Sequence, residues 1–308
     1  MTQHALFARP ADEGPTKGLF ASRPIEHMVE MAAYEALWMR EGMWFRQLAE
    51  LFESHPGALP SELVDELELA QAMAGLDKVF PEATPFDVRV NGAGEYPAKL
   101  READHPVEVL YYKGDWDLAL SRSVAIVGTR EPSEMGVQHA RRIAQALSRE
   151  GFTIVSGLAK GIDSAVHHEV LRCGGATVAV IGTPLSEAYP RENQKLQQRI
   201  ATEHLLISQV PFLRYAANHW KTNRLFFPAR NVTMSALTEA TIIIEAGNTS
   251  GTLVQARAAL SQKRKLFILE PCFHNPELTW PAKYAEQGAI RVSNITQIVE
   301  ALGRGSAI

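Results

Sequence analysis

The chain has 308 residues, of which 46% are hydrophobic and 21% charged, as in a globular protein with one large domain or a core domain and a smaller companion. The two cysteines, Cys173 and Cys272, lie far apart, so neither a disulfide framework nor a thiolate zinc site is expected. No signal-peptide pattern opens the sequence and no apolar run approaches a membrane span, so we expect a cytoplasmic protein with no membrane partner.

The net charge of −4 is unevenly distributed along the sequence. Residues 1–100 contain 8 Lys and Arg against 16 Asp and Glu, whereas residues 101–308 contain 23 against 19. We therefore expect any polyanion to bind the second part of the chain.

The first part of the chain predicts helices. Residues 1–23 are interrupted by Pro and Gly and are expected to form a flexible arm. Apolar residues then recur at three- and four-residue spacing, which predicts a small helical domain over residues 24–80. Residues 76–94 contain several Pro, Gly and Asp residues and are expected to include a linker.

The second part, residues 95–308, alternates between two patterns. Short apolar runs typical of buried strands occupy residues 107–112, 124–127, 152–155, 177–181, 204–208, 241–245, 265–269 and 289–292. Helical patterns occupy residues 136–150, 161–173, 193–203, 251–264 and 294–303. This alternation predicts an α/β fold with a doubly wound, mostly parallel, Rossmann-like sheet.

Ligands of such sheets bind beyond the carboxyl ends of the strands, so the residues after each strand are candidate ligands. Gly128, Thr129 and Arg130 follow the first core strand, and Gly136 opens the next helix. Backbone N–H groups at a helix start, together with a guanidinium, suit a phosphate. The alternative is a tight turn with a solvated arginine.

A second turn of this kind follows the next strand. Ser156, Gly157, Lys160 and Gly161 combine small residues with a positive charge at a helix start, which again suits an anion. Two further residues are possible ligands, although helix capping and a structural role are the alternatives for them: Asp163 and His167.

A third turn contains Ser250 and Gly251, which follow a strand ending near Glu245. Three such turns at one sheet edge indicate a site for the phosphates of a nucleic acid or nucleotide. Glu245 is a possible site residue as an acid, and the alternative is a structural role.

Residues 213–237 interleave basic and aromatic side chains. Arg230 and Asn231 are candidate ligands, and Lys221, Arg224 and Phe227 are possible ones. Such interleaving suits single-stranded nucleic acid, because bases stack on aromatic rings while phosphates pair with cations. The alternative is that the aromatic residues belong to the core and the charges to its solvated rim.

These motifs together resemble the DNA-processing protein A family, also called DprA or Smf, across roughly residues 95–270. The segments that carry the resemblance are VAIVGTR, GFTIVSGLAKGIDSAVH, FPARN and IIIEAGNTSGTLVQARAAL. The resemblance implies a homodimer that binds single-stranded DNA and loads a RecA-type recombinase onto it, with no enzymatic activity and no cofactor. It also implies that the first two turns hold phosphates, with Lys160 in place of the family's usual arginine, and that the helical domain is SAM-like.

The sequence also departs from the family pattern. Val232, Thr233 and Met234 follow Arg230-Asn231, where the family has a second arginine and isoleucines. We expect a divergent member without the C-terminal winged helix of many relatives. Two alternatives stay open: a module that senses nucleotide signals, as in phage defence, and an enzyme related to the phosphoribohydrolases. The enzyme is disfavoured, because EAGNTSGT replaces the PGGxGT motif of those enzymes.

Overall fold

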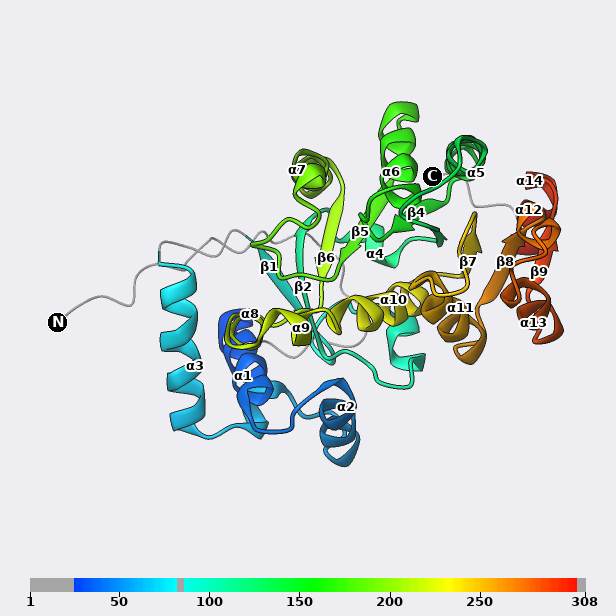
Figure 1. Ribbon diagram of the computed structural model, residues 1–308. Coiled ribbons are helices and arrows are strands. Elements are labelled where there is room, and N and C mark those ends of the chain that lie inside the picture. Colours follow the sequence, from blue (N-terminus) through cyan, green and yellow to red (C-terminus); the bar gives the residue numbers. More distant parts are fainter. Residues whose placement is uncertain (1–24, 82–85, 304–308) are drawn as a thin grey trace.

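The computed structural model describes residues 25–81 and 86–303, and Figure 1 shows the arrangement of their helices and strands. The predicted flexible arm lies outside the described residues. The helical first part contains α1 (His27–Met39), α2 (Phe45–Ser54), η1 (Pro60–Leu63) and α3 (Glu66–Val79). Asp65 begins α3, because its carboxylate accepts a hydrogen bond from the Glu68 backbone N–H, at 2.8 Å.

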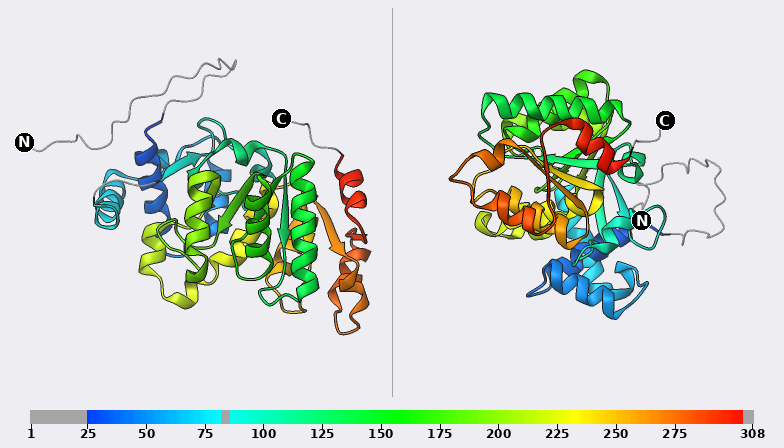
Figure 2. Two further views of the ribbon diagram at one scale, coloured as in Figure 1. Left: turned by 90° about the horizontal axis from the view of Figure 1, so that it is seen from above. Right: turned by 90° about the vertical axis from the view of Figure 1, so that its right-hand side faces the viewer.

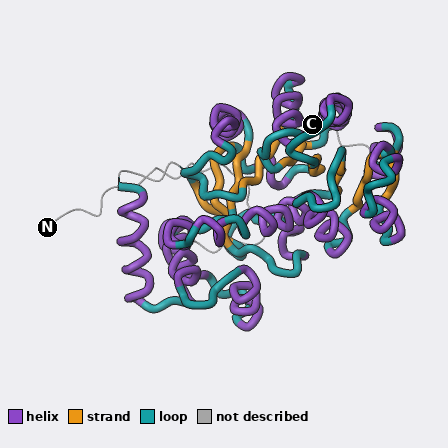
Figure 3. Tube along the Cα trace, in the orientation of Figure 1, coloured by secondary structure: helices purple, strands orange, loops and turns teal. Residues whose placement is uncertain are grey.

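The described residues form one nine-stranded sheet with the order β1-β2-β6-β5-β4-β3-β7-β8-β9. Figure 3 shows the strands in orange among the purple helices. Neighbouring strands in the series β6-β5-β4-β3-β7-β8-β9 are parallel. β2 pairs antiparallel with both β1 and β6. The bounds are β1 (Asp87–Val90), β2 (Val109–Gly114), β3 (Ser123–Val127), β4 (Thr153–Ser156), β5 (Thr177–Ile181), β6 (Leu205–Ser208), β7 (Ala240–Ile243), β8 (Lys265–Leu269) and β9 (Ile290–Val292). The predicted fold class is confirmed, and all eight predicted strands are present.

Helices cover both faces of the sheet (Figure 2). One face carries α5 (Glu134–Arg149), α6 (Ile162–Cys173), α7 (Gln194–Glu203) and α14 (Ile295–Leu302), and the other carries α10 (Phe226–Leu237) and α11 (Thr252–Ser261). The shorter helices are η2 (Ala98–Glu102), α4 (Asp117–Leu120), η3 (Arg191–Asn193), α8 (Phe212–Ala217), α9 (Trp220–Asn223), α12 (Pro271–His274) and α13 (Trp280–Glu286).

The order in which the chain adds strands to the sheet reverses between β3 and β7. The chain adds β4, β5 and β6 on one side of β3, then returns to place β7 on its other side. The connections that leave β3 and β7 therefore run to opposite faces, α5 on one and α11 on the other, which leaves a crevice at the carboxyl ends of these two strands.

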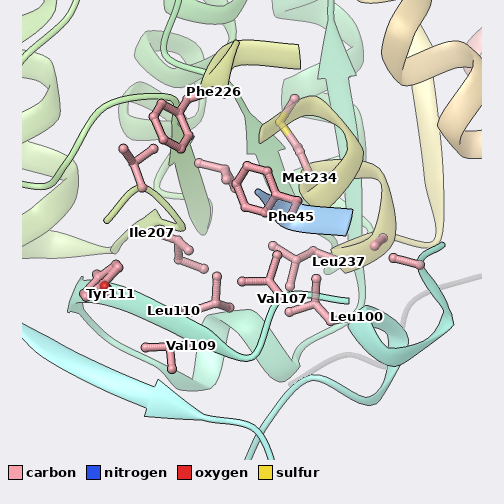
Figure 4. Packing of buried hydrophobic residues seen from close by; sticks show 14 of the residues in the cluster. Phe45, Leu100, Val107, Val109, Leu110, Tyr111, Ile207, Phe226, Met234 and Leu237 are labelled. Atoms are coloured by element: carbon pink, nitrogen blue, oxygen red, sulfur yellow. The ribbon is translucent and has the colours of Figure 1, made fainter. Parts of the chain in front are cut away.

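One segment differs from the sequence-based expectation, and in a second the alternative interpretation holds in part. The predicted linker contains β1, a strand of four residues whose Val88 and Val90 are buried, and its Pro- and Gly-rich flanks conceal so short a run. Residues 213–237 are mostly helical, and Phe226 is fully buried, 6.0 Å from Phe45 of α2 between ring centroids. Figure 4 shows both rings in one cluster with Met234, so the helical part and the sheet share a continuous hydrophobic core.

A buried carboxylate also joins the helical part to the sheet. Glu35 of α1 has no exposed surface and accepts three hydrogen bonds: from Tyr111 Oη of β2 at 2.7 Å and from the backbone N–H groups of Phe212 and Leu213 at 2.8 and 2.9 Å. The carboxylate thereby caps the N-terminus of α8. Burial raises the pKa of Glu35 to about 7, against the opposing effect of the hydrogen bonds.

Glu35→Gln is therefore expected to make stability less dependent on pH. A folded-state pKa above the unfolded value stabilises the protein below the unfolded pKa, and this contribution is lost as the pH rises through the folded pKa. Between pH 4.5 and about 7 the loss is about 3 kcal/mol in the wild type and absent in the variant. Urea unfolding of both proteins at pH 4, 5, 6, 7 and 8 measures the difference. A constant difference across that range would show that Glu35 titrates at its ordinary pKa.

Candidate functional site

The crevice at the ends of β3 and β7 contains a cavity of about 480 Å³. Its wall combines the turn after β3 (residues 128–131), the loop after β7 (residues 247–252), and the α10 residues Arg230 and Asn231. A second cavity of about 150 Å³ adjoins it and is lined by Gly157, Lys160, Tyr189 and Phe227, among others. Arg130, Ala159 and Arg230 line both cavities, so the two are neighbours that share part of their wall.

The structure thus brings most of the predicted ligands together. The larger cavity is lined by Gly128, Thr129, Arg130, Asp163, Arg230, Asn231, Ser250 and Gly251, and the smaller one by Arg130, Gly157, Lys160, Phe227 and Arg230. These residues come from four separate segments of the chain, 128–130, 157–163, 227–231 and 250–251. Sequence reasoning did not single out Tyr189, which lies in the loop after β5, or Gly247 and Thr249, which lie within the EAGNTSGT motif.

Two cations of the site are exposed. Arg130 has no hydrogen bond or ion pair with any residue that the structure describes, so its guanidinium is available to a ligand. Lys160 is 64% exposed and lies 3.7 Å from Glu192 Oε1, an ion pair too exposed to hold either side chain firmly. Both cations can therefore pair with a phosphate without losing a buried partner.

Arg230, in contrast, is a buried cation. Its Nη1 donates to the carbonyl oxygens of Gly157 and Val180, and its Nε donates to Asn231 Oδ1 at 2.9 Å. Burial lowers the pKa of Arg230 to about 10, and neighbouring Asp163 opposes this shift, so the side chain is positively charged at neutral pH. The arginine thus fixes the turn after β4 to α10 and adds positive charge to the wall shared by the two cavities.

The Asp163 carboxylate is also buried, with 6% exposure. It accepts a hydrogen bond from the Ala159 backbone N–H at 3.3 Å. Burial raises the pKa of Asp163, and the charge of Arg230 lowers it. Both residues line the larger cavity, and the nearby positive charge of Arg230 limits the negative potential that Asp163 presents to an anion.

Two glycines allow these turns to pack tightly. A Cβ at Gly157 would lie 2.6 Å from Arg230 Nη1, so only glycine leaves room for the guanidinium. Gly161 has a φ of +83°, and a Cβ there would lie 2.5 Å from the Thr129 carbonyl oxygen and 2.7 Å from the Arg130 carbonyl carbon. Both glycines therefore make room for other parts of the protein, whereas the sequence analysis predicted that they make room for a ligand.

Gly161→Ala is expected to destabilise the fold, whereas Gly247→Ala is not. The positive φ alone costs about 1–3 kcal/mol for alanine, and the overlap with the Thr129–Arg130 backbone adds to it. Gly247 is exposed, lines the larger cavity and has no atom within 4 Å of an added Cβ. Chemical denaturation of both variants measures the contrast, and equal stabilities would refute the packing role of Gly161.

The loop after β7 presents the N-terminus of α11 to the larger cavity. The Asn231 Nδ2 group donates to the Gly251 carbonyl oxygen at 3.1 Å, and Thr252 Oγ1 donates to that of Gly128 at 3.2 Å. These bonds tie the loop to α10 and to the turn after β3. Helix N-termini attract anions, and an added Cβ at Gly251 would meet no atom closer than Asn231 Nδ2 at 3.9 Å, so a ligand can approach the backbone there.

The N-terminus of α5, in contrast, already holds a carboxylate. Glu245 Oε2 accepts hydrogen bonds from Ser133 N at 3.1 Å and Ser133 Oγ at 2.9 Å, and a Cβ at Gly136 would overlap that oxygen. Gly136 lines neither cavity. The expectation that Gly136 binds phosphate is therefore not supported, because the anion at this helix start is the protein's own Glu245. This bonding gives Glu245 a structural role.

The remaining predicted residues lie outside the two cavities. Ser156 is buried and donates to the Ile126 carbonyl oxygen at 2.7 Å. His167 is fully buried with Nδ1 2.9 Å from Thr177 Oγ1, and burial lowers its pKa to about 3, so it is a neutral core residue. Arg224 and Lys221 flank the exposed ring of Trp220, at 4.6 and 5.7 Å from its centroid.

Comparison with known proteins points to one family. The family model described as DNA recombination-mediator protein A matches residues 87–303. Protein Smf of Synechocystis is 38% identical over 213 residues, which cover 68% of this chain and 52% of that protein. The chain thus spans about half the length of this curated relative.

Two solved structures share the fold at 28% sequence identity. DNA processing protein A (DprA) from Streptococcus pneumoniae superimposes with a TM-score of 0.69 and covers 91% of this chain and 98% of its own. DNA processing protein A from Helicobacter pylori, whose structure concerns a single-stranded DNA binding mode, has a TM-score of 0.59 and covers 70% of this chain and 95% of its own.

In the ranges that the structure describes, no helix has the length and hydropathy that crossing a membrane requires.

Proposed function

The chain belongs to the DNA recombination-mediator protein A family, and on this basis we propose that it binds single-stranded DNA in the paired cavities at the ends of β3 and β7. The observation that carries the proposal is that the two cavities lie side by side and share cationic side chains. A polar cavity at the N-terminus of α11 adjoins an aromatic one, and Arg130 and Arg230 line both. The similarity to the DNA processing protein A of Helicobacter pylori supports DNA as the ligand.

The two cavities suit different parts of a nucleotide. In the larger one, the Arg130 guanidinium and the backbone at Ser250 and Gly251 would hold a phosphate. In the smaller one, Phe227 and Tyr189, with ring centroids 5.3 Å apart, would stack against a base, with Lys160 at the rim. Bases of a duplex are already stacked on their neighbours and cannot enter this cavity, so the geometry favours single strands.

In this proposal, the surface around Trp220 extends the DNA-binding site beyond the two cavities. Trp220 is 54% exposed on α9, the helix that precedes α10, and Arg224 and Lys221 lie beside it. An exposed indole among cations suits a further nucleotide of a longer strand.

We further propose that the protein forms a homodimer, protects single-stranded DNA and assists its loading with a RecA-type recombinase. The resemblance to the family supports these partners, and no enzymatic step is part of the proposal. Light scattering tests the dimer, and strand exchange by a RecA-type recombinase, with and without the protein, tests the loading. A monomer, or strand exchange at the same rate with and without the protein, would contradict the respective proposal.

Fluorescence anisotropy with a labelled 20-nucleotide oligo-dT tests the DNA proposal. We expect saturable binding at 50 mM salt that weakens at 200 mM, with log K falling by about 0.7 per log[salt] for each phosphate neutralised. A duplex of the same length is the matched competitor and should compete weakly. No binding to the oligonucleotide at 50 mM salt would refute the proposal.

A nucleotide sensor is the second candidate function. The larger cavity, at about 480 Å³, is within the range of about 300–1,000 Å³ of small-molecule sites and has room for a single nucleotide. The acidic and basic side chains that line this cavity are equal in number: Glu131 and Asp163 against Arg130 and Arg230. A rise in Tm with mononucleotides or dinucleotides but not with oligo-dT would favour the sensor over the DNA-binding protein.

A further inference from the structure

A third cavity, of about 420 Å³, lies between the helical part and the antiparallel edge of the sheet. Residues of α2, of the turn after β1 and of the segment between η2 and β2 line it. None of them lines the two cavities at the ends of β3 and β7. The cavity is therefore a separate feature of the molecule, and its role is independent of the proposed DNA binding.

One acceptor atom of this wall is buried without a hydrogen-bond partner. Glu108 is 9% exposed, and its Oε2 accepts a hydrogen bond from Asn91 Nδ2 at 2.6 Å. Among the residues that the structure describes, none donates to Asn91 Oδ1. Acceptors buried without a partner are rare in proteins, because each costs about 1–3 kcal/mol. A ligand with N–H groups would satisfy this oxygen and pair with the adjacent Glu108 carboxylate.

The charge of the wall selects a cation. Glu53 and Asp104 join Glu108 there, against the one basic residue Arg101. Burial raises the pKa of Glu108, and a bound cation would favour its ionised form. No cluster of three or more His, Cys, Asp or Glu residues suited to a metal ion is found in the described ranges, which points away from an inorganic cation.

We propose that this cavity binds a small organic cation whose guanidinium or ammonium N–H groups donate to Glu108 and Asn91. The cavity volume is within the usual range of about 300–1,000 Å³ for small-molecule sites. A guanidinium suits the carboxylate especially, because its planar fork presents several donors to oxygen acceptors.

Titration of the ¹⁵N-labelled full chain with agmatine tests this proposal, because agmatine carries a guanidinium and an ammonium. Butylurea, a neutral molecule with similar N–H donors, is the ligand control. We expect agmatine, and not butylurea, to shift the amide signals of residues near Glu53, Asn91 and Glu108. Glu108→Gln removes the central charge and should weaken binding at least about tenfold.

Two further variants complete the test. Glu53→Gln, at the exposed part of the wall, should weaken agmatine binding by about two- to fivefold without a risk to folding. Glu286→Gln, at an exposed position of α13, should leave agmatine binding unchanged. Three outcomes would each overturn the proposal: no shifts at millimolar agmatine, equal shifts with butylurea, or equal affinity in the wild type, Glu108→Gln and Glu53→Gln.

Discussion

We expect Arg230→Met to lower the free energy of unfolding by about 3–5 kcal/mol, because it leaves the buried carbonyl oxygens of Gly157 and Val180 without their donor. Methionine fills much of the same volume but donates no hydrogen bond. The variant also removes the nearby positive charge that lowers the pKa of the buried Asp163. Urea denaturation at pH 7 measures the loss.

Arg224→Met is the matched control for this prediction. Arg224 lies six residues earlier in the same basic and aromatic segment, but its side chain is exposed beside Trp220. The change should alter stability by no more than about 0.5 kcal/mol, as for most surface substitutions. Equal losses in the two variants would show that Arg230 does not hold the turn after β4 to α10.

Arg130→Ala should weaken binding of single-stranded DNA by about ten- to a hundredfold at 0.1 M salt, with stability unchanged. A charge-assisted hydrogen-bonded contact contributes about 1.5–3 kcal/mol, which corresponds to that range. The guanidinium is exposed and has no partner among the described residues, so its removal breaks no internal contact. The slope of log K against log[salt] should also fall by about 0.7, the value for one phosphate on a single strand.

Arg149→Ala provides the control for charge alone. Arg149 is exposed in the last turn of α5, at the opposite end of the helix from the turn that carries Arg130. The change removes the same net charge but no proposed contact, so affinity should change less than about threefold. If both variants weakened binding equally, the effect of Arg130 would be general electrostatics, and the cavity would not be the contact point.

The fold was predictable from the sequence because its strands are continuous apolar runs between helical patterns. Each predicted strand from residues 107 to 292 corresponds to a strand of the sheet. β1 was missed because four residues with two buried valines give too weak a signal beside Pro and Gly. The shared core was missed as well, since no local pattern shows that Phe45 packs against Phe226.

The site was predictable in position but less so in detail. Ligands cluster at strand ends in this class of sheet, and the turns containing Arg130 and Gly251 do converge there. The individual roles depend on long-range contacts that spacing does not show. Gly157 makes room for Arg230, and Gly136 makes room for Glu245, so both glycines that were expected to approach a phosphate approach a side chain of the protein.

The central claim is that a single strand of DNA binds at the carboxyl ends of β3 and β7. A crystal structure of the full chain with an oligo-dT tests it most directly. The account predicts a phosphate within hydrogen-bonding distance of the Arg130 guanidinium and the Gly251 backbone, and a base against Phe227. DNA bound elsewhere, with both cavities at the strand ends vacant, would contradict it.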